Sequence, residues 1–128
     1  MFPEIASEKK EEVPFIKRLV FDKNWNNKLL CFNFTVIVPE SDKFEVGEKL
    51  DIRIKDRFFC YATISEIKTF KLSEIISAGY NLIDCGLNHK GFMNLMSDKY
   101  NKKKWWNGID TNMKIMFLSK VEQLDLTL

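Results

Sequence analysis

The sequence predicts an α+β protein, a small β-barrel of about five to six short strands with two or three flanking helices. Three observations support this fold class. A strand with strict alternation stands at residues 48–55, the spacing of apolar residues becomes helical after Thr69, and an apolar, strand-like run returns at residues 113–121. Because strands precede and follow the helices instead of alternating with them, a doubly wound parallel sheet is disfavoured.

The clearest strand lies at residues 48–55. Leu50, Ile52 and Ile54 alternate there with charged residues, so one face of the strand is expected in the core and the other in water. A short polar break separates this strand from a second apolar segment at residues 58–67. Such a short connection favours an antiparallel hairpin.

Three other segments are typical of strands. Residues 15–21 are apolar with β-branched members, residues 32–38 end at Pro39, and residues 113–121 form the closing run. Proline ends a strand because it lacks the backbone N–H donor and restricts the residue before it. We therefore expect these strands to complete the sheet around the central hairpin.

Helical spacing predicts one short helical turn and two helices. The turn is expected at residues 26–30, a two-turn helix at 72–79, and a longer helix at 88–100, where apolar residues recur at three- and four-residue steps. The stretch between the two helices, which contains Asp84, is interpreted as a link. From Asn101 onward the chain is expected to leave the second helix as a basic loop.

A chain of 128 residues has the size of one domain. Residues 1–12 mix acidic and basic groups with little to bury, so we expect a flexible N-terminal arm before a single domain at 13–128. The N-terminal segment lacks the apolar stretch of a signal peptide, and no run approaches the roughly 18 apolar residues of a membrane span. A cytoplasmic location is expected by elimination.

The cysteines and the histidine disfavour a metal site. Cys31, Cys60 and Cys85 are odd in number, far apart and set in apolar surroundings, so they are expected to be buried thiols in a reducing compartment. They show no CxxC spacing, and His89 is the only histidine, which we place near a helix start. No P-loop or GxGxxG motif occurs, and we expect no metal and no cofactor.

A basic and aromatic loop is the strongest binding motif in the chain. It consists of Lys99, Lys102, Lys103, Lys104, Trp105 and Trp106. Lysines neutralise phosphates and release counterions, and an exposed tryptophan stacks on an unpaired base. We predict a nucleic-acid contact here, although the whole chain has a formal charge of only +2. The alternative is that the tryptophans pack under the loop while the lysines keep it soluble.

Asp84 differs from the other carboxylates because its neighbours are apolar. It stands in the sequence Leu82-Ile83-Asp84-Cys85-Gly86. Partial burial would make this carboxylate a candidate acid or an anchor for backbone donors. The alternative that we favour is a cap for the turn that follows.

Three segments, taken in order, resemble the ASCH domain of the PUA-like superfamily. They are LLCFNFTVI at 29–37, KFEVGEKLDI at 43–52, and ATISEI at 62–67 followed by LSEI at 72–75. The resemblance covers most of residues 15–120. It implies a PUA-like barrel with a cleft that binds RNA or modified nucleosides. In some members of the family it implies an amidohydrolase acting on N4-acetylcytidine, or a ribonuclease.

The enzymes of this family resemble one another in a Gly-x-Lys-x-x-Thr-x-Arg motif that leads into the second strand. They also have a glutamate later in the chain. Thr35 falls at the threonine and Asp84 or Cys85 near the glutamate, but Phe32 falls at the lysine and Ile37 at the arginine. Phenylalanine can neither donate a proton nor hold an oxyanion. The family's reaction would therefore need an ammonium group from elsewhere in this chain.

Lys28, one turn before Phe32, is the residue that could supply that group, and we expect it not to reach the site. Lys28, Thr35 and Asp84 are thus weak catalytic candidates, and the prediction leans towards a protein that is not an enzyme. The expected function is a non-catalytic PUA-like module that binds single-stranded RNA, a nucleotide or a modified base. Its cleft would lie between the second strand and the inter-helix link, with residues 102–106 at the rim.

Two alternatives stay open. One is a divergent ASCH-type amidohydrolase or nuclease that uses Lys28, Thr35 and Asp84. The other is a protein-interaction domain of phage or mobile-element origin, in which phenylalanine and tryptophan side chains form the partner surface. The sequence predicts no membrane partner and says nothing about oligomeric state.

Overall fold

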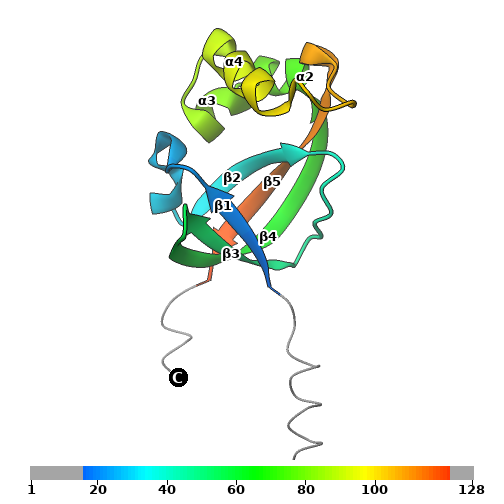
Figure 1. Cartoon of the computed structure of the whole chain (residues 1–128). Helices are drawn as coiled ribbons and strands as arrows, with labels where there is room; N and C mark the ends of the chain where they lie inside the picture. The colour runs from blue at the N-terminus through cyan, green and yellow to red at the C-terminus, as the bar shows by residue number, and fades with distance from the viewer. Residues whose placement is uncertain (1–15, 122–128) are drawn as a thin grey trace, which may run out of the picture.

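One five-stranded sheet forms the centre of the protein (Figure 1). The computed structural model describes residues 16–121, so the arm predicted at 1–12 lies outside the described residues. The strands follow the spatial order β1-β3-β4-β5-β2. Their bounds are β1 Lys17–Phe21, β2 Asn33–Pro39, β3 Lys49–Ile54, β4 Arg57–Lys71 and β5 Asn112–Lys120.

The sheet curls into a half-barrel because its longest strand bends. β4 has 15 residues and pairs with β3 along its first half and with β5 along most of its length. Its register with β3 shifts between Ile52 and Arg53, which leaves Phe59 as an extra residue of β4, and its register with β5 shifts between Ile64 and Glu66. Such irregularities increase local twist and bend a strand. The α+β class is confirmed, but strands β1 and β2 stay at the two edges of the described sheet, so the sheet is a curled half-barrel and not the closed barrel that the sequence predicted.

The predicted strands and the predicted hairpin are confirmed. β3 and β4 pair antiparallel around a tight turn, and β2 and β4 each pair antiparallel with β5. Two features differ from expectation. β4 runs to Lys71 because β5 pairs with it as far as Asn112, and β1 pairs in parallel with β3. Both depend on a partner strand far away in sequence.

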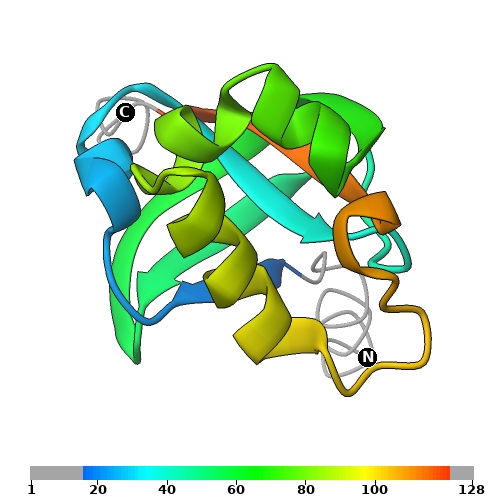
Figure 2. The same cartoon turned by 90° about the horizontal axis from the view of Figure 1, so that it is seen from above.

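Three α-helices of the described residues, α2 Leu72–Ser77, α3 Tyr80–Cys85 and α4 His89–Tyr100, gather at one end of the sheet, and the view from above looks onto them (Figure 2). Of the two 3-10 helices in the same range, η2 Gly108–Asp110 lies with them and η1 Trp25–Leu30 lies beside the strands. Helix α3 was not predicted, because six residues are too few to show helical spacing. The supposed link between two helices is therefore itself a helix.

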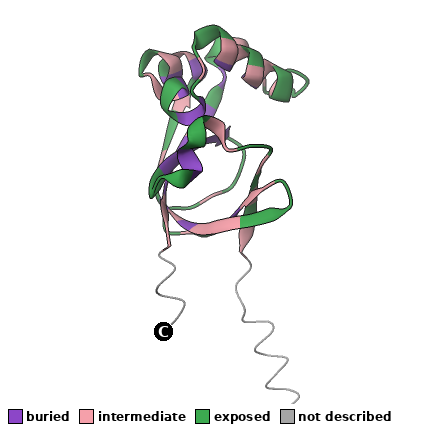
Figure 3. Ribbon diagram, turned by 90° about the vertical axis from the view of Figure 1, so that its left-hand side faces the viewer, coloured by how far each residue is buried: buried purple, intermediate pink, exposed green. Residues whose placement is uncertain are grey.

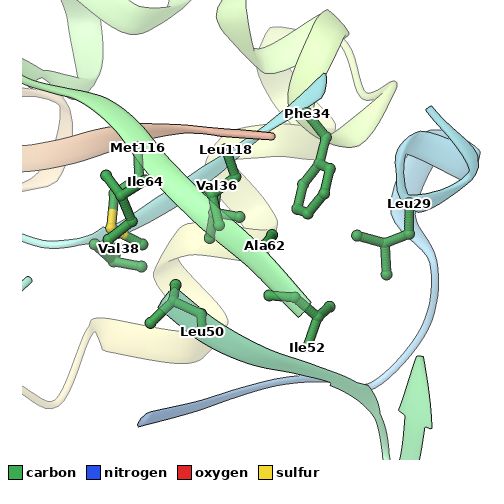
Figure 4. Close-up of a cluster of buried hydrophobic side chains, with 10 residues drawn as sticks. All are labelled: Leu29, Phe34, Val36, Val38, Leu50, Ile52, Ala62, Ile64, Met116 and Leu118. Atoms are coloured by element: carbon green, nitrogen blue, oxygen red, sulfur yellow. The ribbon is translucent and has the colours of Figure 1, made fainter. Parts of the chain in front are cut away.

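Two apolar clusters form the core. The first fills the concave side of the sheet, where side chains from η1 and four strands point towards one another (Figure 4). Its members are Leu29, Phe34, Val36, Val38, Leu50, Ile52, Ala62, Ile64, Met116 and Leu118. The second lies between the sheet and the helices and includes Ile37, Ile75, Phe92, Met113 and Ile115. Alternation along β2 assigns Val36 to the first cluster and Ile37 to the second.

The helices present one side to the second cluster and the other to solvent (Figure 3). Phe92 and Met96 are the buried residues of α4. Its N-terminus is capped by Asn88, whose side chain accepts a hydrogen bond from Gly91 N at 2.9 Å, and His89 lies at the helix start, one residue after the predicted first residue. The helical layer therefore covers only one end of the sheet.

Two glycines bound α3, and alanine substitutions at these positions should have unequal effects. Gly79 and Gly86 have φ of +82° and +73°, a region that costs an L-residue about 1–2 kcal/mol. A Cβ at Gly79 meets nothing within 4 Å, whereas one at Gly86 would lie 3.0 Å from Asn26 Oδ1. We expect both Gly79→Ala and Gly86→Ala to lower the free energy of unfolding in urea, with the larger loss at Gly86. Equal losses would contradict the close contact with Asn26.

Candidate functional site

A buried ammonium group lies at the centre of the site. Lys28 in η1 is only 6% exposed, and its Nζ lies 2.7 Å from Asp84 Oδ1. Asn26 and Asn27 turn the backbone inward with φ of 56° and 53°, a conformation that asparagine tolerates. Asn24 Oδ1 accepts a hydrogen bond from Leu29 N at 2.9 Å and fixes the turn. The irregular η1 thus directs a lysine into the protein.

A hydroxyl group shares the same carboxylate oxygen. Thr35 in β2 donates from Oγ1 to Asp84 Oδ1 at 2.8 Å, and it is buried. In the alternation of β2 it follows Phe34 of the first core cluster and precedes Val36, so its side chain points to the helical side. Lys28 and Thr35 therefore meet on a single acceptor atom, Asp84 Oδ1.

Cys85 completes the surroundings of Asp84. Its Sγ donates to Asp84 Oδ2 at 3.1 Å, so both carboxylate oxygens accept a hydrogen bond. Burial raises the pKa of the Cys85 thiol to about 12, and the neighbouring Asp84 charge adds to this effect. The thiol therefore acts as a hydrogen-bond donor. The expected capping role of Asp84 is wrong, because among the described residues its partners are side chains.

Asn26 holds the two sides of the site together. Its Nδ2 donates to the backbone oxygens of Leu82 and Ile83 at 3.1 and 3.0 Å. These carbonyl groups belong to the last turn of α3, next to Asp84. The Asn26 side chain therefore fixes η1 against α3, and with it the separation of Lys28 from Asp84.

The three weak catalytic candidates come together in the structure. Sequence reasoning expected Lys28 not to reach the site, and this expectation is wrong. The two side chains that meet Asp84 are 56 and 49 residues away along the chain. No sequence pattern could have shown this contact, because it depends on the inward turn at Asn26 and Asn27 and on the unpredicted helix α3.

A cavity of about 740 Å³ opens beside the cluster, and we call it the β2–α3 cavity. Lys28 and Thr35 form part of its wall, and Asn26, Asn33, Ser65, Glu66 and Cys31 add polar or thiol groups. The apolar lining comes from Phe34, Leu82, Ile83, Phe117 and Leu118. The expected cleft between the second strand and the inter-helix segment is thus present at Asn33–Thr35 and Leu82–Ile83, without any of residues 102–106 in its lining.

A second cavity of about 330 Å³ lies on the other side of the cluster. It is lined by Lys28 and Asp84 together with Phe21, Trp25 and Met96, among others. Lys28 lines both cavities, whereas Thr35 lines only the larger one and Asp84 only the smaller one. The ion pair therefore forms part of the partition between them.

Except for Lys99, the residues of the basic and aromatic loop line neither cavity beside Lys28. Lys102, Lys103 and Lys104 are exposed, and Trp105 is 38% exposed with its ring centroid 5.4 Å from that of Tyr100. Trp106 is half-buried and packs against the second core cluster. Trp105 lines a third cavity with Glu40 and Ser41, among others. Lys99, the first residue of the motif, is exposed on α4 and lines the smaller cavity beside Asp84.

The cysteines differ from one another more than the sequence indicated. Cys85 is buried, Cys60 is half-buried and Cys31 is exposed, so the expectation of three buried thiols is wrong for Cys31. Within residues 16–121, no three His, Cys, Asp or Glu side chains form a group that could hold a metal ion. No helix in that range is long and apolar enough to cross a membrane.

Comparisons with protein-family models, with curated proteins and with solved structures found no match to this chain. The resemblance to the ASCH family therefore stays a prediction from the sequence. The Lys28–Thr35–Asp84 cluster and the cavity beside it are the features from which a function is inferred.

The buried ion pair should respond differently to single and paired substitution. Asp84→Ala leaves the Lys28 ammonium buried without a partner, which should cost about 3–5 kcal/mol of unfolding free energy. The double variant Lys28→Met with Asp84→Leu replaces both charges by apolar groups and should recover most of this loss. Urea denaturation of both variants measures the difference. A double variant as unstable as the single one would contradict the ion pair's burial.

Proposed function

We propose that this chain binds an uncharged, nucleoside-sized molecule in the β2–α3 cavity. The observation that carries the proposal is the placement of Lys28 and Thr35 in the wall of a cavity of about 740 Å³. Cavities of about 300–1,000 Å³ with mostly apolar walls and a few fixed polar groups are typical of small-molecule sites. The resemblance to ASCH domains implies a PUA-like barrel with a nucleoside cleft, and it points to the same ligand class.

The charge of the cluster favours a neutral ligand over a phosphate. The Lys28 ammonium is paired with the Asp84 carboxylate at 2.7 Å, so the buried wall of the cavity carries no net charge from this pair. The exposed Glu66 carboxylate also lines the cavity and would repel an anion. An amide or carbonyl edge, such as that of a nucleobase, suits this environment better than a phosphate group.

The hydrogen-bonding groups of the wall suit such an edge. An ammonium has three N–H donors, and among the described residues Lys28 donates only to Asp84, so two donors are available to a ligand carbonyl. Thr35 Oγ1 donates to Asp84 and keeps its lone pairs as acceptors for a ligand N–H. The Phe117 ring and the Leu82 and Ile83 side chains provide apolar surface for a flat ring.

Binding can be tested by isothermal titration with cytidine, uridine, adenosine and guanosine, and with their 5′-monophosphates. We expect at least one nucleoside to bind and to bind more tightly than its monophosphate. Thr35→Val removes the acceptor and should weaken binding by about 2- to 10-fold, the effect of one neutral hydrogen bond.

Two exposed apolar residues provide a matched control for the cavity. Ile83 lines it and Leu30 does not, although both are exposed. Ile83→Arg should obstruct the cavity and abolish binding, whereas Leu30→Arg should leave binding unchanged. If none of the nucleosides binds the unmodified protein, or if both arginine variants behave alike, the proposal is wrong.

A second function is favoured by one specific contact, the hydrogen bond from Thr35 Oγ1 to Asp84 Oδ1 at 2.8 Å. A hydroxyl that donates to a carboxylate has the geometry of a nucleophile beside a general base. We propose that the site hydrolyses an acylated amine of the bound nucleoside. Thr35 Oγ attacks the acyl carbon while its proton passes to Asp84, and Lys28 donates a hydrogen bond to the resulting oxyanion.

The remaining steps release the product. Collapse of the tetrahedral intermediate breaks the C–N bond, and the leaving amine takes the proton from Asp84. Water then attacks the acyl-threonine ester, with Asp84 accepting a proton from water and returning it to Thr35 Oγ. The acid and the free amine leave, and the starting arrangement of Lys28, Thr35 and Asp84 is restored.

Acetate release from N4-acetylcytidine tests the hydrolytic function. Thr35→Ala should abolish acetate release, whereas Thr35→Ser keeps a hydroxyl group and should retain part of it. Asp84→Asn removes the base and should lower the rate by about 10²- to 10⁴-fold. If the unmodified protein releases no acetate but binds the nucleoside, the hydrolytic function is excluded and the binding function stands.

A further inference from the structure

Strands β1 and β3 and the start of β4 lie at the end of the sheet away from α2, α3 and α4 (Figure 1), and they carry a second group of basic and aromatic side chains. It occupies the outer face of β1, β3 and β4, and we call it the hairpin face. Its members are Arg18, Lys49, Asp51, Arg53, Phe58 and Tyr61. None of these residues lines either cavity beside Lys28.

The pairing of the strands places these side chains together. In β3, Leu50 and Ile52 point into the first core cluster, so the residues between and beside them point outward. Asp51 pairs with Tyr61 and Arg53 pairs with Phe58 across the hairpin. The shift between Ile52 and Arg53 brings Phe58 to the outer face, where its ring centroid lies 5.0 Å from that of Tyr61.

Cations lie next to both rings. Lys49 Nζ lies 4.7 Å from the centroid of the Tyr61 ring, and the Arg53 guanidinium lies 5.9 Å from that of Phe58. At these distances a cation is attracted to the face of an aromatic ring. On the hairpin face, each of the two aromatic rings therefore lies next to a positively charged side chain.

The single acid on this face does not cancel its positive charge. Asp51 is buried, and its carboxylate lies 3.2 Å from Arg53 Nε and 3.6 Å from Arg18 Nε. One carboxylate shared by two guanidinium groups leaves one positive charge, to which Lys49 adds another. In the adjoining turn, Lys55 and Arg57 outnumber Asp56.

The aromatic surface is also accessible. Phe58 is 49% exposed at the end of the hairpin, and Lys49 is exposed beside the Tyr61 ring. Helices α2, α3 and α4 pack against the other end of the sheet, where the second core cluster lies. The Phe58 ring adjoins the half-buried Tyr61 ring, and a cation lies beside each, which is the combination that binds unpaired bases.

We propose that the hairpin face binds single-stranded nucleic acid. Unpaired bases stack on Phe58 and Tyr61, and Arg18, Lys49 and Arg53 contact the phosphates that follow. Stacking platforms combined with basic groups are how proteins bind single strands without sequence readout. The cations would attract any polyanion, but the exposed ring adjoining them favours a polyanion that also carries flat rings. This surface is independent of the nucleoside proposed for the β2–α3 cavity.

The experiment uses the full chain and fluorescein-labelled 12-mers of oligo(U) and oligo(dT), followed by fluorescence anisotropy at several salt concentrations. Phe58→Ala should weaken binding by about 5- to 100-fold, the range expected for one stacked base. Phe32→Ala is the matched control, because Phe32 is 51% exposed and Phe58 is 49% exposed. We expect Phe32→Ala to leave the affinity unchanged.

The contribution of positive charge on the hairpin face is tested by the salt dependence of the affinity. Lys49→Ala should reduce the slope of log affinity against log salt by about 0.7, the value for one phosphate contact of a single strand. Lys90→Ala, on the first turn of α4, makes the same change of charge away from the hairpin face and should leave the slope unchanged. Thermal unfolding of each variant separates loss of binding from loss of fold.

Three results would overturn the inference. The first is no binding of either 12-mer at low salt. The second is an equal effect of Phe58→Ala and Phe32→Ala. The third is binding that disappears in the triple variant Lys102→Ala, Lys103→Ala, Lys104→Ala but ignores Phe58→Ala, because the basic loop would then be the contact.

Discussion

The buried contact between Lys28 and Asp84 is the interaction on which the arrangement of the site depends. It joins η1, which precedes β2, to α3, which follows β4, and Thr35 attaches β2 to the same carboxylate. Removing two charges from water costs several kcal/mol for each ion, and only good geometry with further hydrogen bonds offsets this cost. Here the carboxylate accepts hydrogen bonds on both oxygens, and Asn26 fixes the two elements side by side.

The open form of the sheet explains why this contact is needed. In the described part of the chain, the edge strands β1 and β2 do not pair, and residues of both, together with Lys28 and α4, line the smaller cavity. A closed barrel would satisfy its edges by hydrogen bonds between strands. In this protein η1 and α4 border the gap instead. The ion pair holds η1 there, and so a polar cluster stands between two cavities in a largely apolar interior.

The two proposed binding surfaces differ in the way their charges are used. In the β2–α3 cavity the lysine is neutralised by its partner, so selectivity depends on hydrogen bonds and on shape. On the hairpin face the single acid is shared by two arginines, so positive charge is left for an anionic partner. The contrast follows from burial, because an unpaired charge is tolerated on the surface but not inside.

Local pattern in the sequence predicted much of the fold. Period-two alternation identified β3 with Leu50 and Ile52 inward, and a short polar break identified the hairpin, because hairpin partners are neighbours in sequence. Helix α3 was missed because a six-residue helix bounded by glycines has no repeat to recognise. The inward turn at Asn26 and Asn27 could not be foreseen either, because it depends on left-handed backbone, which leaves no periodic pattern in the sequence.

The sequence by itself determined the α+β class, the strand segments, the start of α4 to within one residue of His89 and the residue types available for chemistry. Only the tertiary structure decided that Lys28 reaches Asp84 and that Thr35 joins them beside the β2–α3 cavity. It also decided that the basic and aromatic loop lies away from that cavity. The physical reason is the distance along the chain over which each kind of interaction acts. Periodicity and turn chemistry act over a few residues, whereas the site is assembled from side chains about fifty residues apart, whose meeting depends on how the whole sheet curls.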